Sequence, residues 1–242
     1  MFVAAFVFAL LTVYVTAEIP SYIHVCGRRD PNINQCILDN VNNMKDKLCM
    51  GIPELSVPAF EPVIIDKLVV ADTPNTKFYL KNVVINGLCD FDVKSLQSDL
   101  KKNHFKVDLI LNHIIINATY DIDARIVIPI NQKGDAFVKT DDVRAIANMD
   151  LTITSKNGKR YVYMSQMKIN LDLKTYDIQL NVDERERSEL SRIVGIFIGS
   201  NQKDIIAVVK PLLEEVISKR ILLIANEIVK HFTYEELFPD RT

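Results

Sequence analysis

The histidines of this 242-residue chain are the first residues to test for catalytic or metal-binding chemistry. They lie far apart, and none belongs to a His-Glu-x-x-His motif or has a second ligand at helical spacing. The four are His24, His104, His113 and His231. The chain also lacks a Gly-x-Ser-x-Gly nucleophile elbow and a Gly-x-x-x-x-Gly-Lys phosphate loop. We therefore expect no enzyme, no metal site and no cofactor.

Asp121 and Asp123 are two carboxylates at a spacing that would allow them to act as an acid pair. They share one side of a predicted strand with Arg125, and charged side chains are the ordinary content of a solvent-facing strand surface. We therefore assign them to the solvent face rather than to catalysis.

Residues 2–15 carry no charge and are followed by Thr16 and Ala17, small residues typical of a signal-peptidase cleavage site. The apolar stretch is too short to span a bilayer comfortably. We expect a signal peptide over residues 1–17 and a secreted, extracellular chain over residues 18–242 that forms one domain.

The four cysteines indicate disulfides in an oxidising compartment. Cys26 and Cys36 are close in sequence and are expected to pair, which leaves Cys49 and Cys89 to each other. Four cysteines nevertheless allow three connectivities, and the sequence does not choose among them.

The composition is that of an ordinary folded protein, with 48% hydrophobic and 25% charged residues. The formal net charge is −2, and Lys and Arg are scattered rather than grouped. A nucleic-acid partner is therefore not expected. No later apolar segment reaches membrane-spanning length without charges, so we expect no transmembrane helix. We also expect the chain to be a monomer.

Residues 63–182 predict an antiparallel meander of strands. Ile114, Ile116, Ala118 and Tyr120 alternate with Ile115 and then with polar residues, which predicts a strand with one dry and one wet face. The apolar phase is opposite at residues 107–111, so we expect a bend or bulge near residues 112–113. The pair at 157–158, Asn-Gly, predicts a type I′ hairpin followed by one long strand over residues 161–181.

Asn117 begins an Asn-Ala-Thr triplet, the acceptor pattern for N-glycosylation. It falls on the wet face of the predicted strand, where a glycan would be tolerated. We expect Asn117 to be exposed and treat its glycosylation as a prediction.

Helical spacing predicts a helix over residues 34–50 and a long helix over residues 204–232. The long helix would run about 43 Å at 1.5 Å per residue, so an extended, curved element must cover its apolar stripe. A charged link at residues 183–187 and a short helix over residues 188–198 precede it. The predicted fold class is α+β, with a highly curved antiparallel sheet wrapped around a long C-terminal helix.

An apolar tunnel would form if the interior between this helix and the sheet were incompletely filled. On the helix and the sheet, the residues predicted to line it are Val209, Leu213, Val216, Leu223, Phe232, Ile114, Ile116 and Tyr120.

The chain also resembles a known family. Its opening, Cys26-Gly27-Arg28-Arg29-Asp30-Pro31 with Cys36, is followed by Gly51-Ile52-Pro53-Glu54-Leu55-Ser56-Val57-Pro58, and it closes with Tyr234-Glu235-Glu236-Leu237-Phe238-Pro239. These motifs resemble those of the insect takeout and juvenile-hormone-binding proteins. The resemblance implies a tubular lipid-binding fold with a tunnel for isoprenoids or other lipids, and a disulfide between Cys26 and Cys36.

We therefore predict a secreted carrier that binds a small elongated hydrophobic ligand, such as a juvenile-hormone-like isoprenoid or a fatty acid, in an internal tunnel. The alternative is a secreted signalling or interaction protein that engages a receptor or a microbial lipid and has a reduced tunnel. A filled interior with a large exposed apolar patch would favour the alternative.

Overall fold

The computed structural model describes residues 19–125, 129–182, 195–196, 199–200 and 202–242. The predicted signal peptide, the charged link at 183–187 and most of the predicted helix at 188–198 lie outside these residues.

The described elements are two longer helices, two short helical segments and seven strands. In chain order they are α1 (Ile33–Met50), the 3₁₀ turn η1 (Pro53–Leu55), β1 (Val63–Asp72), β2 (Thr76–Asn86), β3 (Phe91–Asp99), β4 (His104–Arg125), β5 (Pro129–Lys156), β6 (Lys159–Asp172), β7 (Asp177–Val182), α3 (Gln202–Val229) and α4 (Tyr234–Leu237). The two predicted helices are thus confirmed. So is the α+β class, with a large curled antiparallel sheet and a long C-terminal helix.

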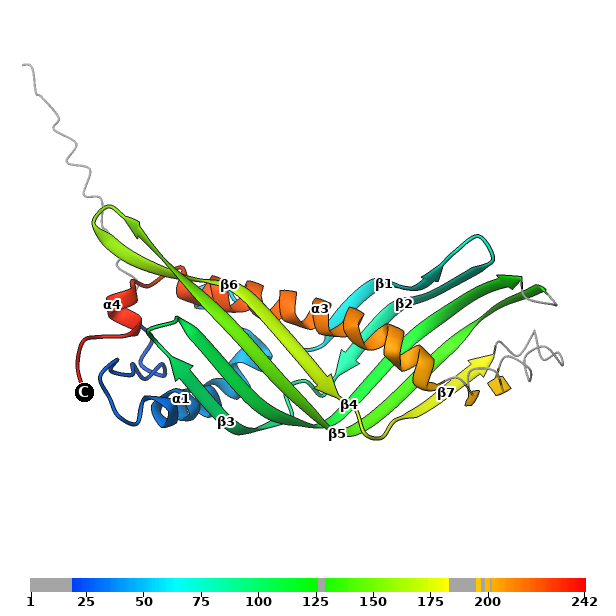
Figure 1. Ribbon diagram of the computed structural model, residues 1–242, viewed down its shortest axis with the longest axis horizontal. Helices are drawn as coiled ribbons and strands as arrows, with labels where there is room; N and C mark the ends of the chain where they lie inside the picture. The colour runs from blue at the N-terminus through cyan, green and yellow to red at the C-terminus, as the bar shows by residue number, and fades with distance from the viewer. Residues whose placement is uncertain (1–18, 126–128, 183–194, 197–198, 201) are drawn as a thin grey trace, which may run out of the picture.

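β4 and β5 form the central pair of the sheet, and they are hydrogen-bonded to each other from His104–Asp150 to Arg125–Pro129. In one half of this pair, β3 lies beside β4 and β6 lies beside β5. In the other half, β2 lies beside β4, with β1 beyond it, and β7 lies beside β5. Figure 1 shows the resulting elongated molecule, with α1 and α4 at one end and the β1–β2 hairpin at the other. One buried hydrophobic cluster nevertheless extends through both halves of the sheet.

The two halves meet where β4 changes its outer neighbour. β3 pairs with β4 as far as Leu111, and β2 begins to pair at Ile115. The buried set changes phase over the same interval, from Leu111 to Ile114. The β4–β5 pairing keeps one register before and after residues 112–113, so β4 has no inserted residue relative to β5 there. The change predicted at this point is therefore a change in which alternate residues of β4 are buried and in which strand pairs with its outer edge.

The Asn157–Gly158 hairpin is confirmed, with φ of 53° and 75° at its two residues and Lys156 paired with Lys159. The single strand predicted over residues 161–181 is wrong, because strand structure stops after β6 and resumes at β7. The hydroxyl of buried Thr140 on β5 donates a hydrogen bond of 2.6 Å to the carbonyl of Thr175 in the intervening segment. A side chain of β5 thus contacts the chain where the ladder is interrupted.

α3 runs beside the sheet and is attached to β6, whose outer edge has no neighbouring strand among the described residues. The Asn226 side chain accepts a hydrogen bond from the Met164 N–H (2.7 Å) and donates one to the Met164 carbonyl (3.0 Å). The Glu214 carboxylate accepts a hydrogen bond from the Leu171 N–H (2.7 Å). Side chains of α3 therefore satisfy backbone groups that a further strand would otherwise bind.

Replacing Asn226 with Ala should lower the free energy of unfolding by about 1–3 kcal/mol, because it leaves two partly buried backbone groups of Met164 without partners. Urea unfolding measures the loss. Lys219→Ala is the control, because Lys219 is an exposed residue of the same helix and should change stability by less than about 0.5 kcal/mol. Equal effects of the two variants would contradict a stabilising role for the Asn226 contacts.

Two disulfides join the N-terminal part of the chain. Cys26 and Cys36 are bonded at 2.01 Å, and Cys49 and Cys89 at 2.11 Å, which leaves no free cysteine. The first links the segment before α1 to that helix, and the second links the end of α1 to the turn between β2 and β3. Both pairings match the sequence-based expectation.

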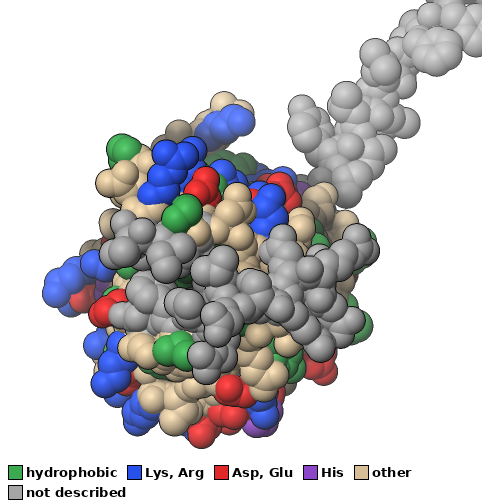
Figure 2. Space-filling model, turned by 90° about the vertical axis from the view of Figure 1, so that its right-hand side faces the viewer, with side chains coloured by type: hydrophobic (Ala, Val, Ile, Leu, Met, Phe, Trp, Pro, Cys, Tyr) green, Lys and Arg blue, Asp and Glu red, His purple; other side chains and the backbone are tan. Residues whose placement is uncertain are grey.

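Within the described part of the chain, no helix has the length and hydropathy needed to cross a membrane. Figure 2 shows the end of the molecule on the right of Figure 1, where basic and acidic side chains lie interspersed on the described surface. This end therefore shows no broad surface of one sign of charge.

Candidate functional site: an apolar cavity between two helices and the sheet

An apolar cavity of about 240 Å³ lies in the half of the molecule that contains α1, β3 and β6. Its wall is built by α1, by the turn before β3, by β3 to β6 and by α3, and all but one of the lining side chains are uncharged. The lining residues are Val41, Lys45, Leu48, Cys49, Phe60, Leu88, Cys89, Phe91, Val93, Val107, Leu109, Leu111, Ala145, Ala147, Met149, Met167, Ile169, Leu171, Ile217, Ile221 and Ile224.

The sheet side of the wall consists of rows of residues paired across neighbouring strands. One row runs Val93, Leu109, Ala145 and Leu171 from β3 to β6. Residues two positions apart in a strand face the same side, so each strand gives alternate residues to the cavity. The regular alternation of β4, β5 and β6 therefore produces a continuous apolar floor.

Alanine at two central positions leaves space in this floor. Ala147 lies between Val107 and Ile169 in the row next to that of Ala145. Both alanines are buried, yet neither side chain extends beyond a methyl group. Large residues on the flanking strands with small ones between them leave a hollow that close packing would otherwise remove.

The two helices complete the wall with one face each. α1 contributes residues at positions 41, 45 and 48, and α3 contributes Ile217, Ile221 and Ile224. These are three- and four-residue steps, which place side chains on one side of a helix. Each helix therefore faces the floor with an aligned stripe, which is apolar on α3 and apolar except for Lys45 on α1.

The Cys49–Cys89 disulfide lies in the wall itself, where it joins α1 to the turn before β3. The same turn is held by Glu61, whose carboxylate accepts hydrogen bonds from the N–H groups of Gly87 and Cys89. Gly87 has φ of +93°, and a Cβ there would meet the His113 carbonyl oxygen at 1.7 Å. Only glycine lets the turn lie this close to β4.

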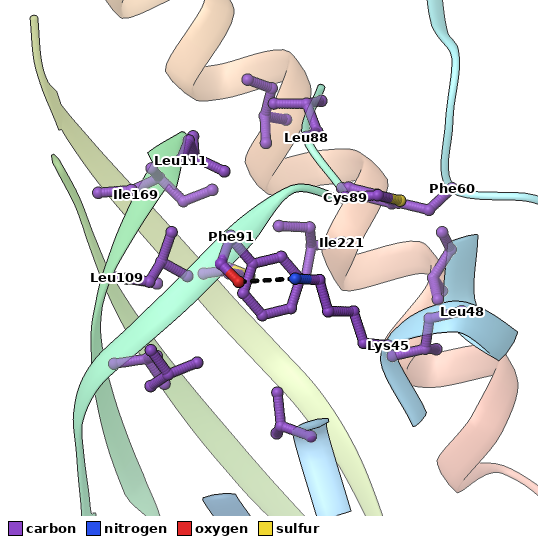
Figure 3. A pocket seen from close by; sticks show the side chains of 18 of the residues that line it. Lys45, Leu48, Phe60, Leu88, Cys89, Phe91, Leu109, Leu111, Ile169 and Ile221 are labelled. Carbon is purple, nitrogen blue, oxygen red and sulfur yellow. Dashed lines mark hydrogen bonds between the residues drawn. The ribbon is translucent and has the colours of Figure 1, made fainter. Parts of the chain in front are cut away.

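Lys45 is the single charged residue among the described residues that line the cavity. Its ammonium donates a hydrogen bond of 2.8 Å to the Phe91 carbonyl and lies 4.7 Å from the centre of the Phe91 ring. Figure 3 shows the side chain extending from α1 toward Phe91, with the amine beside the ring. The site thus combines apolar walls with one cation.

A second hollow of about 320 Å³ lies between α3 and β6. Charged side chains contribute to its lining, among them Lys168, Glu214, Glu215 and Lys219. Such a surface suits water better than an apolar molecule. The cavity beside α1 is therefore the candidate binding site.

The family model described as haemolymph juvenile hormone binding protein matches residues 2–239, nearly the whole chain. The chain belongs to the haemolymph juvenile hormone binding protein family. This agrees with the resemblance found in the N-terminal and C-terminal motifs.

Two relatives of this family member are distant in sequence, but each aligns with most of the chain. The circadian clock-controlled protein daywake of Drosophila melanogaster is 22% identical over 231 residues, covering 90% of this chain and 88% of daywake. A putative beta-carotene-binding protein of Schistocerca gregaria is 20% identical over 229 residues, covering 91% and 89% of the two chains.

The crystal structure of Takeout 1 from Epiphyas postvittana matches with a TM-score of 0.72 at 20% identity, covering 89% of this chain and 99% of that one. At this identity the match supports the fold. Takeout 1 and this family member therefore share the curled sheet and the long C-terminal helix.

None of the eight residues predicted to line a tunnel lies among those that line this cavity. Most are packed elsewhere in the interior: Val209, Leu213, Ile114 and Tyr120 are buried in the main core, with Val216 and Ile116 partly buried against it. Phe232 is fully buried in a cluster with Met44, Ile52 and Leu55.

Leu223 was expected to face the interior, but its side chain is 51% exposed. It lies two residues from Ile221, which is roughly 200° around an α-helix. The apolar residues of α3 extend around more of the helix than the buried face, so apolar character alone misplaces Leu223.

The sequence-based prediction missed every residue that lines the cavity, including those of α1 and of the turn before β3. Lys45 and Cys49 lie about forty positions before Cys89 and Phe91 in the sequence, and a disulfide of sequence separation 40 joins the two segments. The expected pairing of Cys49 with Cys89 was the signal that could have placed α1 beside the sheet.

Of the two carboxylates considered for catalysis, Asp123 is exposed and Asp121 has basic partners. The pKa of Asp121 lies below its ordinary value, chiefly because Lys81 donates a hydrogen bond to it (2.7 Å), and Lys133 adds a second positive charge. A carboxylate held ionised in this way is poorly suited to donate a proton near neutral pH.

Two histidines pair with aspartates directly across β4 and β5. His104 Nδ1 lies 2.7 Å from an Asp150 carboxylate oxygen, and His113 Nδ1 lies 2.7 Å from one of Asp141. The His113 hydrogen bond lowers the pKa of Asp141. Across the described residues, no three or more His, Cys, Asp or Glu side chains gather into a group that could hold a metal ion.

Asn117 is exposed on the outer face of β4, as the alternation predicted. It pairs in the sheet with Val84 on β2 and Phe137 on β5. Its glycosylation stays a prediction.

Proposed function

We propose that this protein is a secreted carrier that binds a small elongated hydrophobic molecule in the cavity beside α1 and releases it chemically unchanged. The observation that carries the proposal is the cavity of about 240 Å³, whose wall is apolar except for Lys45. Burial of apolar ligand surface would drive binding at about 25 cal/mol per Å².

Membership of the haemolymph juvenile hormone binding protein family supports a hydrophobic ligand. The relative from Schistocerca gregaria is named a putative beta-carotene-binding protein. Beta-carotene is an elongated hydrocarbon. The ligand class we propose is therefore an isoprenoid, a fatty acid or a related lipid.

Secretion is supported by the uncharged segment at residues 2–15 and by the pairing of all four cysteines in disulfides. Exposed Asn117, the acceptor residue of the glycosylation triplet, fits the same route. We expect the mature carrier to begin at residue 18 and to act as a monomer without cofactor.

A signalling or interaction protein with a reduced tunnel receives less support. Its interior would be filled and an apolar patch would lie on its surface. The exposed large hydrophobic side chains of the described residues are instead spread over several elements, including Met50 at the end of α1, Ile64 on β1, Tyr163 on β6 and Val208 on α3.

Ligand extraction tests the proposal. Protein secreted by insect cells should release an apolar small molecule into organic solvent, detectable by mass spectrometry, and the emptied protein should bind an uncharged naphthylamine dye with increased fluorescence. A correctly folded protein that yields no apolar molecule and binds no dye would refute the carrier function.

A further inference from the structure

Lys45 is an unusual residue for the wall of an apolar cavity. Charged side chains are costly to remove from water unless they are paired and hydrogen-bonded. Lys45 is half-buried on α1, and its neighbours in the wall include Val41, Leu48 and Phe91. A methionine or leucine would complete the same apolar stripe without that cost, so the charge itself needs an explanation.

The hydrogen bonds of Lys45 leave part of its capacity unused. An ammonium group carries three N–H donors. One donates to the Phe91 carbonyl, and the Phe91 ring lies beside the charge. In the described portion of the chain, Lys45 forms no ion pair with a carboxylate.

The carboxylate of Glu61, which contacts the turn that carries Cys89, is already engaged. It accepts hydrogen bonds from the N–H groups of Gly87 and Cys89, at the turn that leads into β3. Its role there is to hold the cavity wall. The Lys45 ammonium is therefore a cation at the edge of an apolar space with donors to spare.

We propose that the cavity takes an apolar molecule that bears a carboxylate, and that Lys45 binds this carboxylate while the hydrocarbon part lies along the floor of β4 to β6. The inference rests on the proposed carrier function and adds the chemical class of the ligand. A carboxylate accepts charge-assisted hydrogen bonds from an ammonium, which are stronger than those between neutral groups. The Phe91 carbonyl and ring fix the position of the amine.

A methyl ester tests this assignment, because it keeps the chain and the carbonyl of a fatty acid but removes the negative charge. Decanoic acid and methyl decanoate are compared by displacement of the uncharged naphthylamine dye from the emptied protein, at a pH where the acid is ionised. The unmodified protein should bind the acid roughly ten- to hundredfold more tightly than the ester.

Two variants separate the charge from the structural contact of Lys45. Lys45→Met removes both the charge and the N–H donors, whereas Lys45→Gln removes the charge but keeps an N–H donor on a side chain one bond shorter. Both should bind acid and ester with about equal affinity. Lys47→Met is the matched control, because Lys47 is an exposed residue of the same helix whose ammonium lies over the Tyr22 ring instead; it should keep the preference for the acid.

The outcomes distinguish this inference from the carrier function. Equal binding of acid and ester by the unmodified protein, or a preference that survives in Lys45→Gln, would overturn the role of Lys45 while leaving the carrier function standing. A loss of affinity for acid and ester alike in both Lys45 variants would also overturn it and show that Lys45 only holds α1 against β3. Failure of the unmodified protein to bind the dye, the acid and the ester would refute both proposals.

Discussion

Ala147→Phe should lower the affinity for an apolar probe by roughly a hundredfold. Ala147 lies in the floor of the cavity between Val107 and Ile169, so the added ring extends into a space of about 240 Å³. We expect it to exclude roughly four methylene groups of a ligand. At about 0.8 kcal/mol per buried methylene, the loss is about 3 kcal/mol, or about a hundredfold in affinity.

Asn148→Phe provides the matched control for this prediction. Asn148 is the next residue of β5, so its side chain faces the opposite side of the sheet, where its strand partners are Lys106 and Lys168. The variant adds the same ring outside the cavity and should leave the dye affinity within about twofold.

Both variants are measured by dye titration and by urea unfolding. Inserting a ring into a cavity costs less stability than inserting it into a fully packed core. Folded Ala147→Phe protein that binds the dye as tightly as the unmodified protein would show that the ligand lies elsewhere.

The direction in which each strand residue faces could be predicted from sequence, because it depends on alternation within one strand. Asn117 is exposed and Tyr120 is buried, as the pattern required. The same local information predicted the Asn157–Gly158 turn and both helices. These features depend on residues that are near one another in the chain.

The position of the cavity could not be predicted in this way. It depends on Ala145 and Ala147 lying between larger residues of β4 and β6, and that arrangement follows from the register of three strands. Periodicity shows that Leu213 and Ile217 both face inward, yet only Ile217 lines the cavity. Whether an inward side chain meets another side chain or an empty space is set by the volumes of residues far away in sequence.

The interruption between β6 and β7 was missed for a related reason. The sequence alternates through residues 173–176 without a glycine or a proline to mark a break. The pairing of β5 keeps a consistent register on either side, from Arg144–Asp172 to Lys139–Asp177. The break coincides with the point where the two halves of the sheet meet, which is a tertiary feature that the local sequence does not record.

Removing the Cys49–Cys89 disulfide should affect stability and ligand binding together. The bond closes a loop of sequence separation 40, and the loss of this constraint on the unfolded chain is worth about 4 kcal/mol. Its two residues also lie in the cavity wall, beside Leu48 and Leu88. The double variant Cys49→Ala/Cys89→Ala should therefore lose about 4 kcal/mol of unfolding free energy and roughly tenfold in dye affinity.

The other disulfide separates these two effects. Cys26–Cys36 closes a loop of sequence separation 10, for which the same constraint is worth about 3 kcal/mol, and neither residue lines the cavity. Cys26→Ala/Cys36→Ala should therefore reduce stability but preserve dye affinity at temperatures where the variant is folded. Urea unfolding and dye titration of both double variants test this. If both variants lose affinity in proportion to their loss of stability, the Cys49–Cys89 bond stabilises the fold without shaping the binding site. If affinity falls in the Cys49→Ala/Cys89→Ala variant alone, the bond holds α1 at the distance from β3 that keeps the cavity open.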